Sequence, residues 1–176
     1  ETLLQRIVRG TGIRGLAGIP SARSDEKGYT IVRPLLSTSR KEIEDYVAEH
    51  ALRPNYDESN DSVEYTRNRI RRELIPYLEK YFNPEVKEAL QSLANIAAPE
   101  EDYMEEQTRT ALAALQRETP KGEQILDAAG IRALHPAMAR RVVAQVIREC
   151  SGDENLRYTI VENVLNILQS ENPSAS

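Results

Sequence analysis

The chain lacks several of the residues and segments that would assign a protein to a class at once. Its 176 residues include one cysteine, two histidines, one phenylalanine and no tryptophan. The single Cys150 excludes an intrachain disulfide and a multi-cysteine metal site, as is usual in a reducing compartment. No run of about 18 apolar residues and no secretory signal pattern occurs. We therefore expect a cytoplasmic protein with no membrane contact and no metal ligands of its own.

Excess positive charge is also absent. The formal net charge is −5 and the isoelectric point is about 5.2, so a globally basic nucleic-acid surface is excluded and any such contact must be local. Charged residues make up 29% and hydrophobic residues 40%, which is an ordinary globular balance. Residues 1–80 carry a net charge of +1, whereas residues 81–176 carry −6.

This change in charge coincides with a helix-start signal. Asn83 is suited to cap a helix and Pro84 to occupy its first position. We therefore expect two domains, residues 1–82 and 83–176. Because Glu1-Thr2-Leu3-Leu4 has the character of a helix interior, we also expect the chain to be part of a longer protein.

The first half mixes helix and strand signals. Apolar residues at helical spacing predict a helix over residues 3–8 that ends at Gly10, and residues 29–32 predict a short strand. Ser39 and Glu42 form a capping-box pattern at the start of another helix. This mixture is typical of the end of an α/β domain.

The second half predicts helices only. One begins after Asn83 and should be kinked or split at Pro99, one runs from Pro136 to Ser151-Gly152, and one covers residues 160–168. An acidic run at 100–106 is interpreted as a solvated face near a helix N-terminus. The fold class is therefore mainly α with a small β contribution, an α/β remnant followed by an all-α domain.

A glycine cluster occupies residues 9–18. Gly10, Gly12 and Gly15 satisfy the dinucleotide-binding expression, but a helix precedes them and Pro20 interrupts the segment after them, so that function is rejected. A structural loop is favoured over a phosphate-binding loop, because glycine clusters commonly serve turns.

A second constellation is a helix rich in arginine, predicted from a capping box at Asp61 to about Leu78. At 100° per residue, Arg67 and Arg71 lie beside an apolar stripe, whereas Arg69 and Arg72 project from the opposite side. Arginines beside an apolar stripe need partners, which the preceding Asp57, Ser59 and Asn60 could supply. A structural clamp and an anion pocket remain equally good interpretations. His50, His135 and Cys150 stand alone in sequence and predict no metal or catalytic role.

Read in order, these segments resemble the tRNA(Ile)-lysidine synthetase family of PP-loop ATPases. The segments are Glu1-Thr2, residues 9–19, Arg33-Pro34-Leu35-Leu36, Arg40 with residues 42–46, residues 57–61, residues 65–71 and Ile75-Pro76. The similarity is close over residues 1 to about 84 and weaker beyond. It implies that residues 1–82 are the C-terminal part of a PP-loop domain and that 83–176 form a helical tRNA-recognition domain.

The resemblance also implies a reaction and its residues. In this family a wobble cytidine of tRNA(Ile) is adenylated with ATP, with Mg²⁺ on the phosphates, and the amine of free lysine then displaces AMP. The implied catalytic residues are Asp57, Asn60, Arg67, Asn68 and Arg71. The implied nucleotide- or substrate-binding residues are Glu1, Arg9, Gly10, Gly12 and Arg33.

One departure limits what this chain is expected to do alone. The PP-loop sequence Ser-Gly-Gly-x-Asp-Ser does not occur in it, so we expect no bound ATP and no activity from these residues by themselves. A second copy covering the apolar face of residues 3–8 would make a homodimer. There are two alternatives. One is a fragment of a PP-loop tRNA thiolase, which would need a cysteine pair for sulfur transfer. The other is a non-catalytic RNA- or protein-binding helical module.

Overall fold

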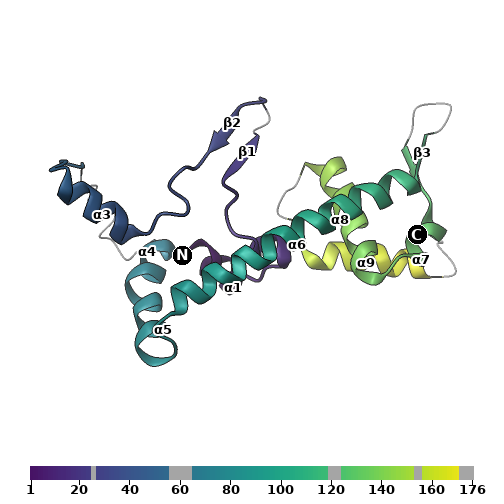
Figure 1. The fold of residues 1–176 in the computed structure, drawn as a ribbon. Coiled ribbons are helices and arrows are strands. Elements are labelled where there is room, and N and C mark those ends of the chain that lie inside the picture. Colours follow the sequence, from purple (N-terminus) through teal and green to yellow (C-terminus); the bar gives the residue numbers. More distant parts are fainter. Residues whose placement is uncertain (25–26, 56–64, 119–123, 153–155, 171–176) are drawn as a thin grey trace. The chain divides into compact units, whose positions relative to one another are not determined.

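The computed structural model describes residues 1–24, 27–55, 65–118, 124–152 and 156–170 (Figure 1). Helices dominate, with two short antiparallel hairpins, as the sequence predicts for a mainly α chain. The chain forms two compact units, Glu1–Glu101 and Asp102–Ser176, which we call unit 1 and unit 2. The division into domains at residue 82 stays a prediction.

Unit 1 combines short helices with one hairpin. Its elements are α1 (Thr2–Arg9), α2 (Ile13–Leu16), β1 (Ala22–Ser24), β2 (Thr30–Val32), α3 (Arg40–Glu49), α4 (Thr66–Arg69), the π-helical η2 (Ile70–Leu74), α5 (Ile75–Tyr81) and the first part of α6 (Val86–Leu115). The predicted strand pairs with β1, in the register Ala22 to Val32.

Local sequence signals set several helix ends in unit 1. Gly10 ends α1 with φ 83°, a conformation that favours glycine. At α3, the Ser39 hydroxyl accepts a bond from the Glu42 N–H at 3.2 Å, and the Glu42 carboxylate accepts one from the Ser39 N–H at 2.7 Å. The predicted capping box is therefore confirmed. The Asn83 side chain accepts a hydrogen bond from the Glu85 N–H at 2.9 Å, just before α6.

A small hydrophobic cluster joins the two ends of unit 1. Leu4 of α1, Ile70 of η2 and Ile75 of α5 are buried together. Leu74, Leu78 and Leu90 pack against them. Residues some 65 positions apart in sequence are thereby held side by side, which places the start of α1 next to α4.

Of the two outcomes predicted for Pro99, a kink or a split of the helix, the split does not occur. Helix α6 runs without a break through Pro99. An interior proline removes one backbone donor and crowds the preceding turn, but here the hydrogen bonds of the turns on either side keep the helix continuous. The acidic run at 100–106 consequently lies in mid-helix rather than at an N-terminus, and Glu101 is buried rather than solvated.

The prediction that the second half contains helices only is also wrong. Unit 2 includes a hairpin of β3 (Gln116–Glu118) and β4 (Gln124–Leu126) between α6 and α7 (Ala128–Ala133). The three residues of β3 are all polar and carry no β-branched pattern, so strand pairing rather than propensity holds them extended. Asp127 then caps α7 by accepting bonds from the N–H groups of Ala129 and Gly130, each at 3.0 Å.

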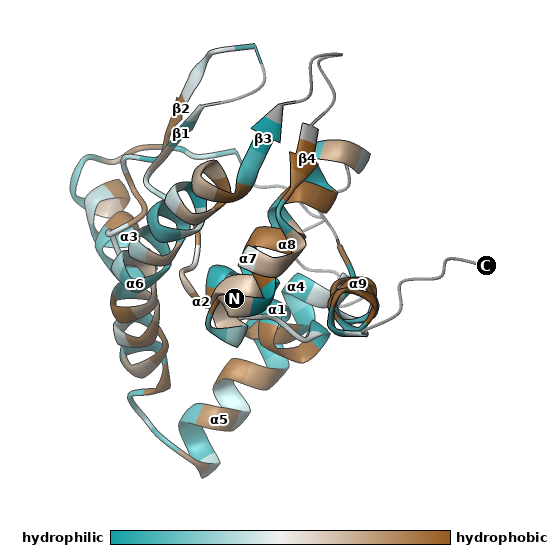
Figure 2. Cartoon of the chain, turned by 90° about the vertical axis from the view of Figure 1, so that its right-hand side faces the viewer, coloured by the Kyte–Doolittle hydropathy of each residue, from teal (hydrophilic) through white to brown (hydrophobic). Residues whose placement is uncertain are grey.

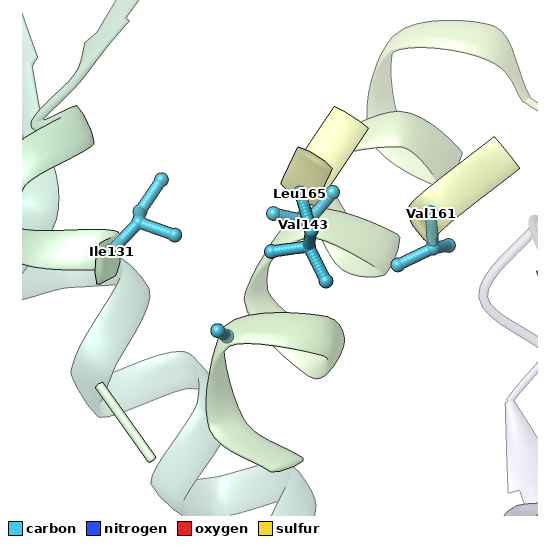
Figure 3. Close-up of a cluster of buried hydrophobic side chains, with 5 residues drawn as sticks. Ile131, Val143, Val161 and Leu165 are labelled. Atoms are coloured by element: carbon cyan, nitrogen blue, oxygen red, sulfur yellow. The ribbon is translucent and has the colours of Figure 1, made fainter. Parts of the chain in front are cut away.

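The core of unit 2 lies among its last three helices. Helices α8 (Pro136–Ser151) and α9 (Tyr158–Gln169) have the predicted positions, and Gly152 ends α8 in the left-handed conformation. Figure 3 shows Val143 of α8 and Leu165 of α9 close together, with Ile131 of α7 and Val161 of α9 in the same cluster. Eight further apolar side chains pack around this cluster. Unit 2 therefore has a larger core than unit 1.

Candidate functional site

Three charged side chains meet at the start of unit 1. The Arg67 Nε donates to Glu1 Oε2 at 2.9 Å. Arg71 binds the same carboxylate through two nitrogens, with its Nη2 3.0 Å from Oε2 and its Nε on Oε1. We call Glu1, Arg67 and Arg71 the arginine cluster. It holds one carboxylate between two guanidinium groups.

The folding of α1 against α4 and η2 builds this cluster. Glu1 is the N-cap residue of α1, but its side chain makes no capping hydrogen bond. One turn later Leu4 is buried with Ile70. Because that contact fixes the start of α1 beside η2, the Glu1 carboxylate reaches arginines 66 and 70 residues away.

Electrostatics favour the charged form of Glu1. Burial by itself raises the pKa of this carboxyl, but the hydrogen bonds from Arg71 and Arg67 and the positive charge of Arg71 lower it to about 2. The same contact raises the pKa of Arg71 above its usual value. The Glu1 side chain is 23% exposed, whereas Arg67 and Arg71 are 63% and 44% exposed. The guanidinium groups therefore remain accessible to a further anion.

The helix-face argument agrees with this arrangement. Arg67 and Arg71 bind one carboxylate, as expected for two residues on one side of a helix. Arg69 instead lines a separate groove with Ile70 and Tyr77. Arg71 lies in the π-helical segment Ile70–Leu74, which directly follows Arg69 and is closed by a bond from the Ile75 N–H to the Ile70 carbonyl. Single π-helical turns frequently occur at functional sites.

The other predicted site residues fall into three groups. Asn68 is buried directly between the two arginines in sequence. Arg9 and Gly12 are exposed, and Arg33 donates to the Pro20 carbonyl at 2.9 Å. Asp57 and Asn60, with the capping box at Asp61, lie outside the described residues.

The glycine segment is held by hydrogen bonds from Arg6, a residue that the sequence analysis did not select. The Arg6 Nη1 donates to the carbonyls of Gly15 at 3.0 Å and Gly18 at 2.8 Å. Gly18 has φ 75°, and a Cβ there would lie 3.5 Å from the Ala94 side chain. This geometry supports the structural interpretation of the loop. The i, i+9 and i, i+12 contacts of Arg6 obey no local pattern that could have predicted them.

Glu1 is the second residue whose role in the site was not foreseen. The resemblance implied that it binds a nucleotide or substrate, and the partners of Arg67 and Arg71 were expected within residues 57–60. No periodicity connects residue 1 with residue 67. Only the packing of Leu4 on Ile70 reveals the pairing.

Across the described ranges, no three or more histidine, cysteine, aspartate or glutamate side chains gather as a metal site would require. In the same part of the chain, no helix has both the length and the apolar character needed to cross a membrane.

Comparisons with known proteins show which proteins the chain is similar to. Residues 1–78 match the PP-loop domain family. A tRNA(Ile)-lysidine synthase of Caldanaerobacter subterraneus subsp. tengcongensis is 36% identical over 178 aligned positions, which cover the whole of this chain. The chain is a homologue of the tRNA(Ile)-lysidine synthases.

Two further relatives carry the same name. The protein of Thermosynechococcus vestitus is 34% identical over 174 positions, covering 99% of this chain and 49% of its own length. That of Geobacillus kaustophilus is 42% identical over 112 positions, covering 64% of this chain and 24% of its own length. The chain spans 36% of the length of the Caldanaerobacter relative, about a third.

Proposed function

We propose that this chain is part of an ATP-dependent ligase that joins lysine to the wobble cytidine of tRNA(Ile). The observation that carries the proposal is the similarity to tRNA(Ile)-lysidine synthases along the whole chain, together with the PP-loop match over residues 1–78. Residues 83–176 would then contribute to tRNA recognition.

The reaction has two steps. In the first, the carbonyl oxygen of the cytidine attacks the α-phosphate of ATP, and pyrophosphate leaves. In the second, the lysine amine attacks the activated carbon, AMP leaves with the electron pair of the bond that breaks, and the amine loses a proton. Negative charge builds on phosphate oxygens in both steps, so fixed cations aimed at them lower the barrier.

The arginine cluster supplies cations of this kind. Arg67 and Arg71 are candidate catalytic residues that offset phosphate charge, and both keep a large exposed area. Glu1 is a positioning residue, because its carboxylate fixes both guanidinium groups without neutralising the pair. Two arginines and one carboxylate leave a net charge of +1 at the cluster.

Three further residues keep the roles that the resemblance implies. Asn60 and Asn68 would line the cleft, and the carboxylate of Asp57 would hold or deprotonate the incoming lysine ammonium group. Mg²⁺ would enter with the ATP phosphates. The described residues offer no cluster of metal ligands for it, so no step is assigned to the ion.

The proposal is tested with the full-length product of the gene that encodes this chain. We expect incorporation of radiolabelled lysine into a tRNA(Ile) transcript that requires ATP. A transcript with uridine at the wobble position is the matched control and should accept no lysine. Lack of lysine incorporation in the presence of ATP would reject the proposal.

Two further measurements on the same protein and tRNA, of sulfur transfer and of tRNA binding, distinguish the alternatives. ATP-dependent transfer of sulfur would identify a tRNA thiolase, although Cys150 is the only cysteine in the chain. Binding of tRNA without any ATP-dependent modification would identify a binding module. The 176-residue chain alone should show no exchange between ATP and pyrophosphate, because the PP-loop sequence does not occur in it.

A further inference from the structure

We propose that a groove on unit 1, distinct from the arginine cluster, binds an unpaired base of the RNA substrate. The groove has a volume of about 470 Å³ and is lined by Val8, Ile70, Leu74 and Tyr77, with the polar Thr66, Arg69 and Glu73. This size is in the range of pockets that hold small planar ligands. The proposal rests on the proposed function, because it takes tRNA as the substrate.

An aromatic cluster continues the groove along α5. The Tyr77 ring lies 4.9 Å from the Tyr81 ring and 5.8 Å from the Phe82 ring, measured between centroids. These rings are 53%, 60% and 71% exposed, respectively. Figure 2 shows hydrophobic residues along α5. Exposed, self-supporting rings are the platforms on which proteins stack unpaired bases.

Positive charge accompanies these rings. Residues 66–82 contain five arginine and lysine residues against two glutamates, and two of the five cations, Arg67 and Arg71, are paired with Glu1. The Lys80 Nζ lies 4.9 Å from the centre of the Tyr81 ring. One of the two glutamates, Glu79, is paired with Lys87 at 2.8 Å. The cations beside the groove and its rings, Arg69 and Lys80, complement an RNA backbone, and this favours RNA over an apolar protein segment as the occupant.

The position of the groove fits the chemistry of the neighbouring cluster. Arg69, in the groove, and Arg67 and Arg71, in the arginine cluster, belong to one short helical segment but project to different sides of it. A helix with its side chains is about 10 Å across. The base in the groove is therefore not the cytidine that reacts, but another unpaired nucleotide of the same loop, held so that the cytidine reaches the arginines.

The test uses the full-length protein and measures kcat and KM for tRNA separately. Tyr77→Ala should raise the KM for tRNA about tenfold and change kcat and the KM for ATP less than twofold, because stacking energy is used in binding. Arg69→Gln should raise the KM for tRNA severalfold. Tyr77→Phe keeps the ring and should behave like the wild type.

Tyr29→Ala is the matched control, since Tyr29 is 68% exposed just before β2 of the same unit and lies outside the groove. It should leave both constants unchanged. If Tyr77→Ala does not fold, as judged by circular dichroism, Arg69→Gln still decides the question. An active wild type with unchanged tRNA KM in Tyr77→Ala or Arg69→Gln would overturn the base-binding groove and leave the proposed function intact.

A second experiment separates the two proposals. Fluorescence anisotropy with a labelled anticodon stem-loop should show binding that weakens in Tyr77→Ala. If the wild type transfers no lysine but this dependence holds, the groove is supported and the proposed function fails. If Tyr77→Ala instead abolishes a concentration-dependent dimer while stem-loop binding is unchanged, a second copy is the occupant and the proposal is overturned.

Discussion

The two units differ in how they are held together. Unit 2 buries Ile131, Val143 and Leu165 in one cluster with eight apolar neighbours around it. Unit 1 has a cluster of three buried residues and adds an ionic contact between its sequence-distant ends. Among the described residues, sixteen large hydrophobic side chains are exposed in unit 1 and five in unit 2.

This difference indicates that the core of unit 2 mainly stabilises the fold, whereas the surface of unit 1 carries the candidate sites. Exposed apolar surface and accessible guanidinium groups are features of interaction sites, whereas a closed apolar core serves packing. The arginine cluster and the groove both lie in unit 1. We therefore expect substitutions in the core of unit 2 to act on stability, and those at the arginine cluster and the groove of unit 1 to act mainly on chemistry and substrate binding.

The largest expected effect is in the core of unit 2. Ile131 is 2% exposed, so Ile131→Ala should lower the free energy of unfolding by about 2–5 kcal/mol through lost apolar contacts and a cavity. Urea denaturation measures this loss. Hydrogen exchange should speed up in α8 and α9.

Ile125→Ala is the control for that substitution, because Ile125 is half exposed in β4. It should cost less than about 1 kcal/mol. Faster hydrogen exchange in α1 and α5 of the Ile131 variant would show that the two units unfold cooperatively. That result would contradict the separation of a stabilising unit 2 from a functional unit 1.

The next effect is in the arginine cluster. Glu1→Gln should lower the free energy of unfolding at pH 7 by about 1–2 kcal/mol, a range reduced from the full pKa shift because solvent screens both arginines. The carboxyl pKa is about 2 in the folded chain and near 4.5 when unfolded. The stabilisation is therefore fully present above about pH 4.5 and is lost as the pH falls through 2.

Urea denaturation from pH 7 to pH 2 measures this dependence. The wild type and Glu1→Gln should converge at the acid end. A difference that stays constant with pH would mean that Glu1 contributes by packing and not by charge.

The smallest effect is at the ion pair of unit 2. The Arg140 Nε lies 2.6 Å from Glu162 Oε1, and this contact lowers the pKa of Glu162. This partly buried pair lacks the second guanidinium that Glu1 has, so Glu162→Gln should change the melting temperature by no more than about 2 °C. A melting shift larger than that of Glu1→Gln would reverse the ranking of the two sites.

Helix ends were the part of the fold that could be predicted from sequence. Ser39 with Glu42, Gly10, and Pro136 with Gly152 act within a few residues of themselves, and their short-range signals are confirmed. The continuity of α6 through Pro99 could not be predicted, because the turns on both sides outweigh one lost hydrogen bond. The β3–β4 hairpin depends on pairing between strands that lack a strand pattern.

For the candidate site, sequence predicted the face but not the partner. The spacing of Arg67 and Arg71 is a local property of a helix. The identity of Glu1 as their shared partner depends on tertiary packing of Leu4 against Ile70, which no single sequence displays. The same applies to Arg6 and the two carbonyls that it binds in the glycine segment.

The central claim is that Arg67 and Arg71, on the side of the α4–η2 segment that binds Glu1, take part in lysine transfer, whereas arginines on its other sides do not. Lysine transfer should be measured in the full-length protein with Arg67→Ala, Arg71→Ala and Arg72→Ala, together with their melting temperatures. Arg67→Ala and Arg71→Ala should each lower kcat tenfold or more, about 1.4 kcal/mol in the barrier, while Arg72→Ala stays within twofold of the wild type. Equal losses in all three variants, or losses explained entirely by unfolding at the assay temperature, would contradict it.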